Sequence, residues 1–247
     1  MTELYDSLGV GYRKRRVPDE RIAGRIDAAL AGMANVVNVG AGAGSYELSG
    51  VGARVNLAVE PSMVMIRQRP ADAAIVVQAS GTHLPLVDGC FDACLVILSM
   101  HHWPDPASGL RELRRVATDR VVVVTWDPSA PGFWLTDYFP QILAIDREIF
   151  PSIDLFRAEF DQLDIQPLSI PADCSDGFLG AYWRRPDAYL DEKVRASIST
   201  FAKLTNLTPG LEALRSDLQD GAWLEKYGGE LERDEVDLGY RIVVATQ

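Results

Sequence analysis

The stretch that decides the fold is Val36-Val37-Asn38-Val39-Gly40-Ala41-Gly42-Ala43-Gly44-Ser45-Tyr46-Glu47. Its first part is a short apolar run of β-branched residues, which is typical of a buried strand. Its second part alternates glycine with alanine, so the backbone can turn sharply and lie close to a ligand where no Cβ blocks the approach. Ser45 is a suitable N-cap for a helix whose free N–H groups would face the same point. This order of strand, glycine loop and helix predicts the first β-α unit of a nucleotide-binding sheet.

The spacing of the glycines separates this loop from the dinucleotide fingerprint. A G-x-G-x-x-G/A motif would place Gly or Ala at position 45, where this chain has Ser45. The loop reads G-x-G-x-G instead, and an acidic residue, Glu60, follows Gly40 by about twenty residues, at the end of a second predicted strand (55–60). A carboxylate at that point can accept two hydrogen bonds from a ribose diol.

Strands and helices alternate as far as residue 127. Further strands are predicted at 74–77, 91–98 and 121–126. Asp105 and Pro106 form an N-cap and N1 pair for one intervening helix, and Pro61 is placed to begin another at its first position. This alternation predicts a parallel sheet with right-handed crossovers.

The ordered set of glycine loop, Glu60, Phe91-Asp92 and His101-His102-Trp103 resembles the S-adenosylmethionine-dependent methyltransferases of the Rossmann-like class, in the methyltransferase type 11 group. The resemblance implies an α/β fold with a seven-stranded sheet in the order 3-2-1-4-5-7-6, whose last-inserted strand (239–246) is antiparallel. It implies one domain over 1–247. The core lies at about 20–127, 161–171 and 233–247, and a helical cap over the cofactor site at about 1–19, 128–160 and 172–232. A longer helical stretch is expected from Gly177 to about Glu232.

The same resemblance implies S-adenosylmethionine as the cofactor. The residues expected to bind it are Tyr12, Arg16, Asn38, Gly40, Ala41, Gly42, Gly44, Glu60, Pro61, Ser80, Gly81, Thr82, Leu98 and Ser99. Tyr12 and Arg16 lie four residues apart, on one face of a helix expected over 1–18, where they are placed to cover the methionine end of the cofactor. Two positions depart from the family pattern. Asn38 stands where an acid is usual, and Ser80 replaces an aspartate on the adenine side, so neither offers a carboxylate.

Methyl transfer from a sulfonium is an in-line displacement in which the cofactor carries the activation, so the protein must bind, orient and exclude water. His101 and His102 follow the fourth strand, at the edge where open α/β sheets hold ligands. They are the candidate catalytic bases, with a pKa near neutrality. Successive strand residues point to opposite faces, so at most one is expected to face the substrate if the strand geometry continues through them. His102 is preferred, because in relatives His101 more often belongs to the cofactor wall; simple packing of both is the alternative.

The expected function is methylation of a small molecule, with specialised metabolism as one setting. Aromatic residues in the cap segments favour a substrate with a planar or apolar body. Two alternatives stay open. One is a methyltransferase-fold protein that binds S-adenosylmethionine or S-adenosylhomocysteine without methylating, as a cyclase, decarboxylase or binding module. The other is a nicotinamide dehydrogenase, which Ser45 disfavours. The sequence leaves open the substrate, the methylated atom and whether the protein is a monomer or a homodimer.

Composition excludes several other classes. The net charge of −11 argues against a nucleic-acid partner or an anionic membrane surface, since phosphate binding needs clustered Lys and Arg. No apolar run approaches the roughly 18 residues of a membrane span. The polar start of the chain has no apolar signal core, which predicts a cytoplasmic protein. Cys90, Cys94 and Cys174 lack metal-ligand spacing, so neither a disulfide nor a metal site is expected.

Overall fold

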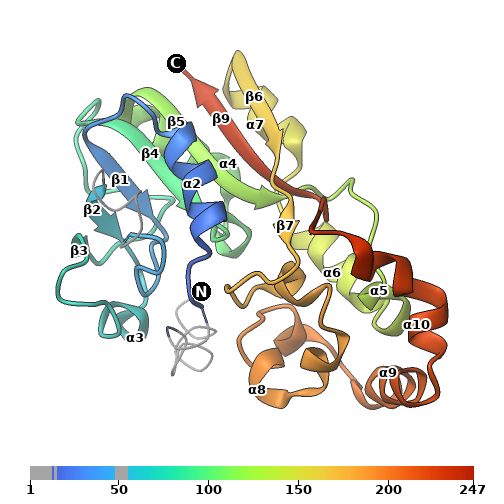
Figure 1. Ribbon diagram of the computed structural model, residues 1–247. Helices are drawn as coiled ribbons and strands as arrows, with labels where there is room; N and C mark the ends of the chain where they lie inside the picture. The colour runs from blue at the N-terminus through green and yellow to red at the C-terminus, as the bar shows by residue number, and fades with distance from the viewer. Residues whose placement is uncertain (1–12, 14–15, 48–54) are drawn as a thin grey trace.

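The computed structural model describes residues 13, 16–47 and 55–247. Seven of the described strands form one sheet, in the order β3-β2-β1-β4-β5-β9-β6 (Figure 1). β1 to β5 pair in parallel, and β9 lies antiparallel between β5 and β6. The predicted fold class and strand order are therefore confirmed. The strands are β1 (Val36–Val39), β2 (Val55–Val59), β3 (Ile75–Val77), β4 (Phe91–Ile97), β5 (Ala117–Trp126), β6 (Gln162–Pro167) and β9 (Tyr240–Thr246).

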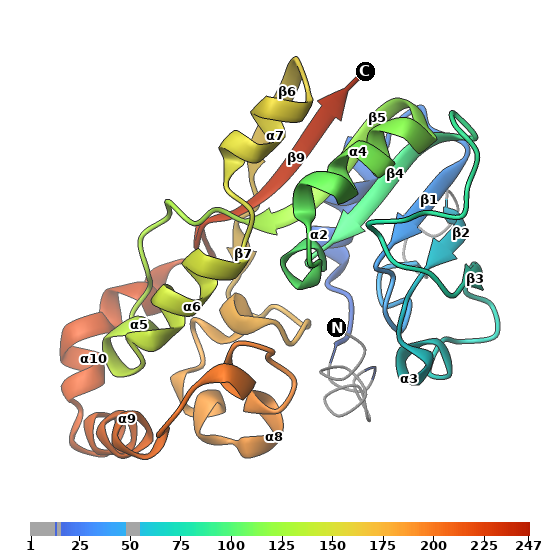
Figure 2. The same cartoon turned by 180° about the vertical axis from the view of Figure 1, so that it is seen from behind.

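Helices cover both faces of this sheet. α2 (Glu20–Ala29) lies on one face, while α4 (Pro106–Val116) and α7 (Ile153–Glu159) lie on the other (Figures 1 and 2). Asp105 caps α4, with Pro106 at its first position, as predicted. Buried side chains fill the two interfaces, among them Ile26, Leu30, Leu110, Leu113, Val116 and Phe156. Coverage on both faces explains why the central strands are apolar almost throughout.

Apart from α7, the helices that follow β5 gather beyond its carboxyl end (Figure 1). They form a cap with its own apolar cluster, in which the rings of Trp134 and Trp223 pack edge to face. The longer helical stretch expected at 177–232 is wrong, because the chain there forms several short helices. Pro209 lies in the first turn of one of them, and Gly221, with φ of 89°, ends it. With η for a 3₁₀ helix, the cap elements are α5 (Leu135–Tyr138), α6 (Gln141–Ile149), η4 (Leu179–Tyr182), η5 (Pro186–Leu190), α8 (Glu192–Arg195), η6 (Phe201–Lys203), α9 (Thr208–Asp220), α10 (Ala222–Tyr227) and η7 (Gly228–Glu232).

A two-stranded sheet of β7 (Ile170–Pro171) and β8 (Glu235–Val236) stands apart from the main sheet. The core segment expected at about 161–171 therefore divides between β6 and β7. α7 lies inside the segment expected to belong to the cap (128–160), yet it packs against α4 and β6. Phe156, which is fully buried among core residues, holds it there.

The helix after β2 begins later than predicted. α3 (Met63–Ile66) follows Ser62, whose hydroxyl accepts a hydrogen bond from the Met65 N–H at 3.4 Å. Ser62 is therefore the N-cap, and Pro61 lies outside the helix rather than at its first position.

Two other expected helices fall mostly on residues that the structure leaves undescribed. Residues 45–47 form turns, and the continuation of the helix expected after Ser45 lies at 48–54, outside the described residues. The same holds for most of the helix expected over 1–18. Among the helices that are described, none is both long and apolar enough to cross a membrane.

Candidate functional site

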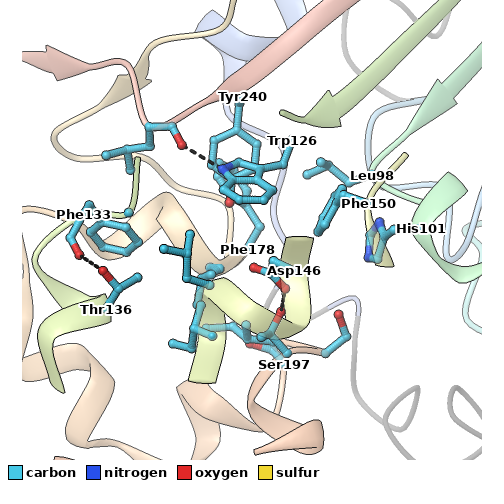
Figure 3. A pocket seen from close by; sticks show the side chains of 18 of the residues that line it. Leu98, His101, Trp126, Phe133, Thr136, Asp146, Phe150, Phe178, Ser197 and Tyr240 are labelled. Carbon is cyan, nitrogen blue, oxygen red and sulfur yellow. Dashed lines mark hydrogen bonds between the residues drawn. The ribbon is translucent and has the colours of Figure 1, made fainter. Parts of the chain in front are cut away.

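Two cavities meet at the carboxyl end of β4, and both are lined by Arg16 and Leu98. The first, called the loop cavity, encloses about 800 Å³ including its open mouth. Its other lining residues are Asn38, Gly40, Ala41, Gly42, Ala43, Ser45, Tyr46, Glu60, Pro61, Ser62, Met65, Ile97, Ser99 and His102. The second, called the aromatic cavity, encloses about 840 Å³ on the same measure (Figure 3). Its other lining residues are His101, Trp126, Pro131, Gly132, Phe133, Thr136, Ile142, Leu143, Asp146, Phe150, Phe178, Leu179, Ser197, Ile198, Ser199, Thr200, Leu238 and Tyr240.

The glycine loop forms one wall of the loop cavity. Gly40, Gly42 and Gly44 all have positive φ, at 73°, 55° and 76°, which side chains other than glycine rarely adopt. A Cβ on Gly40 would also lie 2.3 Å from Ser99 Oγ at the end of β4. The Gly40 and Ala41 N–H groups donate to the Val59 carbonyl, at 2.8 and 3.1 Å, which fixes the loop against β2. Glycine is thus required here both by backbone conformation and by the close approach of the neighbouring strand.

Glu60 lies beside the loop at the end of β2 and is only 6% exposed. Its Oε2 accepts a hydrogen bond from the Gly42 N–H at 2.8 Å, and its Oε1 accepts one from the Ser62 N–H at 2.9 Å. Burial raises the pKa of this carboxyl, although the two N–H groups act in the opposite direction. Each oxygen of a carboxylate can accept a second hydrogen bond. Glu60 can therefore hold the loop in place and still accept two hydroxyl donors from a ligand.

The side-chain amide of Asn38 uses its N–H group in a hydrogen bond, whereas its oxygen is unused. Its Nδ2 donates to Glu47 Oε1 at 2.9 Å, whereas its Oδ1 is buried in the cavity wall and has no partner among the described residues. Glu47 forms a buried ion pair with Arg69, whose Nη1 donates to the Gly42 carbonyl at 3.4 Å. Asn38, Glu47 and Arg69 thus brace the loop from beneath. The sequence does not reveal the roles of Glu47 and Arg69, because their pairing depends on a long-range contact.

An unpartnered buried acceptor, a carboxylate with unused lone pairs and a wall without side chains together fit a nucleoside joined to an amino acid. Such a ligand brings hydroxyl and ammonium donors and needs close approach to the backbone.

Several predicted residues lie elsewhere. Ser80, Gly81, Thr82 and Gly44 are not among the described residues that line the loop cavity. A Cβ on Gly81 would lie 2.5 Å from the Trp103 ring, so this glycine makes room for the indole. The Ser80 and Thr82 hydroxyls hydrogen-bond to each other at 2.9 Å. Tyr12 is outside the described residues. The cofactor contacts of all these residues stay predictions.

Arg16 stands between the two cavities and is held by Asp176, a fully buried carboxylate of the cap. Its Nε donates to Asp176 Oδ1 at 2.5 Å, and its guanidinium lies over the Phe178 ring, 5.9 Å from the centroid. Asp176 also accepts from the Tyr46 hydroxyl at 2.9 Å and from the Gly177 N–H at 2.6 Å. This network ties the segment before α2, the glycine loop and the cap together. Neither Asp176 nor Tyr46 is a predicted site residue.

Leu98, the other shared residue, has φ of 45°, an uncommon value for a side chain of this size. Its N–H donates to the Val124 carbonyl at 2.9 Å, so the neighbouring strand holds the unusual conformation in place. Strained backbone of this kind occurs preferentially at functional sites.

His101 and His102 lie in a 3₁₀ helix, η3 (Met100–His102), so the strand geometry does not continue through them and the alternation that depended on it does not apply. They nevertheless line different cavities. His101 lines the aromatic cavity and stacks on Phe150, with ring centroids 4.0 Å apart, while His102 lines the loop cavity. Burial lowers the pKa of His101 well below its usual range and lowers the pKa of His102 to about 3. Both imidazoles are therefore neutral at pH 7, and neither has the near-neutral pKa expected of a base.

Aromatic side chains from β5, the cap and β9 surround the second cavity. Figure 3 shows Trp126 and Phe150 beside Leu98 and His101, with Phe133 on the opposite side. Asp146 is the acidic residue among those that line this cavity. Among the described residues there is no group of three or more His, Cys, Asp or Glu side chains that could hold a metal ion.

This fold and this pair of cavities define a Rossmann-like protein that binds a nucleoside-containing ligand. Comparisons with known proteins narrow the class. Residues 37–124 match the profile of a methyltransferase domain. The crystal structure of an Anabaena variabilis protein assigned as a methyltransferase from an antibiotic biosynthesis pathway is 33% identical, with a TM-score of 0.86, over 94% of this chain and 99% of that one.

Two further relatives are more distant. An S-adenosylmethionine-dependent methyltransferase of Thermotoga maritima shares the fold, with a TM-score of 0.60 and 15% identity, over 100% of this chain and 99% of that one. The 2-methyl-6-phytyl-1,4-hydroquinone methyltransferase 1 of Oryza sativa subsp. japonica is 28% identical over 95 residues. That match covers 38% of this chain and spans only 28% of the rice protein.

The chain belongs to the S-adenosylmethionine-dependent methyltransferases of the Rossmann-like class, as the sequence predicts. Its cofactor is S-adenosylmethionine.

Proposed function

We propose that this protein transfers the methyl group of S-adenosylmethionine to a small-molecule acceptor in specialised metabolism. The observation that carries the proposal is the pair of adjoining cavities, one built on the glycine loop and one walled by aromatic rings. A cavity of the second kind suits a compact apolar molecule better than a macromolecule. The names of two relatives support the same view, since one refers to an antibiotic biosynthesis pathway and the other to a prenylated hydroquinone.

In this proposal the loop cavity holds the cofactor. Glu60 accepts hydrogen bonds from the ribose diol, and the unpartnered Oδ1 of Asn38 accepts from the amino-acid portion. Gly40 and Gly42 let the ligand lie against the backbone, and Arg16 closes the side toward the second cavity. When bound, the cofactor supplies an electrophilic methyl group on a positively charged sulfur, which needs no further activation.

The remaining work of the protein is to position the acceptor and exclude water. The aromatic cavity opens toward the cofactor at Leu98, and its rings shield the point where the two cavities meet. His101 and His102 are proposed to shape this junction. Because both are neutral at pH 7, either can accept a hydrogen bond from an acceptor group without introducing charge.

Calorimetry with S-adenosylmethionine, S-adenosylhomocysteine and NAD tests the first half of the proposal. We expect both sulfur compounds to bind and NAD not to bind; binding of NAD alone would overturn the assignment. Turnover tests the second half. Radiolabelled methyl transfer from S-adenosylmethionine to phenols, hydroquinones and arylalkylamines is expected to yield methylated product together with S-adenosylhomocysteine.

The neutral histidines also suit a second candidate, a protein that binds the cofactor without methylating. That protein would bind both sulfur compounds and transfer no label to any member of a broad acceptor panel.

A further inference from the structure

We propose that Asp146 anchors an ammonium group of the methyl acceptor in the aromatic cavity, so that the acceptor is an amine with an apolar, planar body. This inference rests on the proposed function and names the chemical class of the substrate. Asp146 is a positioning residue in this proposal and takes no part in the transfer itself.

Asp146 lies on the buried face of its helix, where an acidic residue is unusual. It lies on α6, one turn after the buried Ile142, and is itself only 5% exposed. Acidic side chains are almost never this buried unless they are paired. Figure 3 shows its carboxylate directed into the cavity, between the Phe150 and His101 rings and Ser197.

Among the described residues, the carboxylate has one hydrogen-bond partner. Its Oδ1 accepts a hydrogen bond from the Thr200 hydroxyl at 2.8 Å. In the described ranges no other donor hydrogen-bonds to Asp146, and no cation forms an ion pair with it. The charge of Lys203 lowers the pKa of Asp146 from a distance, without forming an ion pair. Oδ2 therefore faces the cavity as an unused acceptor.

The other groups around the cavity do not supply the missing positive charge. Arg16 is committed to Asp176, and His101 is neutral. Burial raises the pKa of Asp146 only to about 6, so the group is mostly ionised at pH 7. A buried, ionised carboxylate without a cation is costly, and a ligand that brings the cation removes that cost.

The aromatic walls of the cavity also favour a positively charged ligand. The cavity lining includes five aromatic residues, Trp126, Phe133, Phe150, Phe178 and Tyr240. A cation close to such ring faces is attracted by their quadrupoles, and the attraction grows when water is excluded. A neutral hydroxyl would satisfy Oδ2 with one hydrogen bond but would leave the negative charge uncompensated. Carboxylate and rings together therefore select an ammonium over a hydroxyl.

Tryptamine and tryptophol are matched probes, because they differ only in an ammonium against a hydroxyl on the same indole body. Their affinities are measured by calorimetry with and without saturating S-adenosylhomocysteine. Wild-type protein is expected to bind tryptamine at least about tenfold more tightly than tryptophol. Asp146→Asn keeps the acceptor for Thr200 but removes the charge, so it should abolish this preference by weakening tryptamine alone. Asp146→Glu, which restores the charge, should recover part of it.

Asp137→Asn is the control, since it removes an equal charge from an exposed carboxylate on α5 that is paired with Lys226 outside the cavity. It should leave both affinities unchanged. Equal binding of the two probes to wild type, no tryptamine binding, or an unchanged preference in folded Asp146→Asn would each overturn the inference. Binding of S-adenosylhomocysteine is read separately in the same titrations, so its absence would refute the proposed function and not the amine site.

Discussion

The Gly42 N–H donates a hydrogen bond of 2.8 Å to Glu60 Oε2, which joins the tip of the glycine loop to the end of β2. The residue proposed to accept the ribose hydroxyls is therefore also the residue that fixes the loop. In this proposal, one carboxylate therefore both contacts the ribose and holds the conformation of the glycine loop.

We expect Glu60→Ala to weaken S-adenosylmethionine binding by about a hundredfold or more. Two hydrogen bonds to a charged group are worth about 1.5 to 3 kcal/mol each, and about 1.4 kcal/mol corresponds to a tenfold change in affinity. The measurement is a calorimetric dissociation constant on folded protein. Glu60→Gln keeps one acceptor oxygen, so its dissociation constant should lie between those of the wild-type protein and Glu60→Ala. An unchanged constant in Glu60→Ala would remove this residue from the site.

Gly42→Val should lose cofactor binding with only a modest loss of stability. Its φ of 55° is unfavourable for a branched residue, and its Cβ would lie 3.2 Å from the Met65 methyl at the cavity wall. Gly32→Ala is the matched control, because Gly32 has φ of 86° and open space around it. Both variants should be destabilised by about 1 to 2 kcal/mol in denaturant titrations. If Gly42→Val binds the cofactor as Gly32→Ala does, the loop is not a ligand cradle.

The sequence predicts the sheet well because its strands are short apolar runs whose burial is a local property. Val36 to Val39 and Phe91 to Ile97 are visible as strands without knowledge of their neighbours. Family resemblance then supplies the strand order, including the antiparallel β9, which no local pattern contains.

The site is predicted less completely, because its decisive contacts join residues far apart in the chain. Asp176 forms an ion pair with Arg16, and Arg69 forms one with Glu47 beneath the glycine loop. The aromatic residues of the cap are evident in the sequence, but which of them face one cavity depends on how the short helices break. Asp146 did leave a signal, since it interrupts the apolar face of α6 one turn after Ile142.

Asp176→Ala should destabilise the protein by about 3 to 5 kcal/mol, because it leaves the buried end of Arg16 without its carboxylate. The Tyr46 hydroxyl and the Gly177 N–H lose the same acceptor. Chemical denaturation measures the effect. Asp154→Ala, which breaks an exposed pair with Arg157, is the comparison and should cost less than about 1 kcal/mol. Equal effects for the two variants would show that the Asp176 network does not hold the cap to the core.

Neither His101 nor His102 should titrate near neutral pH. Burial lowers the pKa of His102 to about 3, from the ordinary 6.5, and lowers the pKa of His101 as well. Ring nitrogen spectra recorded from pH 5 to 8, with His101→Ala and His102→Ala for assignment, should show both rings neutral throughout. Between pH 6.5 and about 3 the unfolded chain binds the His102 proton and the folded chain does not, so this group makes stability fall on acidification. A ring midpoint near 6.5 in either residue would restore the case for a general base.

Asp146→Asn should stabilise the protein at pH 7 and have little effect at pH 3.5. Burial raises the pKa of Asp146 from 3.8 to about 6, so between these values the folded chain keeps a proton that the unfolded chain has lost. Stability contributed by this group is therefore present below about pH 4 and is lost as pH rises through about 6. The loss is on the order of 3 kcal/mol at pH 7.

Asparagine keeps the acceptor for Thr200 without the charge, so the variant should recover that amount. Denaturation of both proteins at each pH isolates Asp146, since the opposing effect of His102 is common to the two and cancels in their difference. The same ionisation predicts that tryptamine binding to the wild-type protein weakens as pH falls through about 6. The other charged or titratable groups that face Asp146 or its cavity are Lys203, Arg16 and His101. A difference in stability that stays constant with pH would mean that Asp146 does not ionise in this window, and the charge on which the amine site depends would be absent.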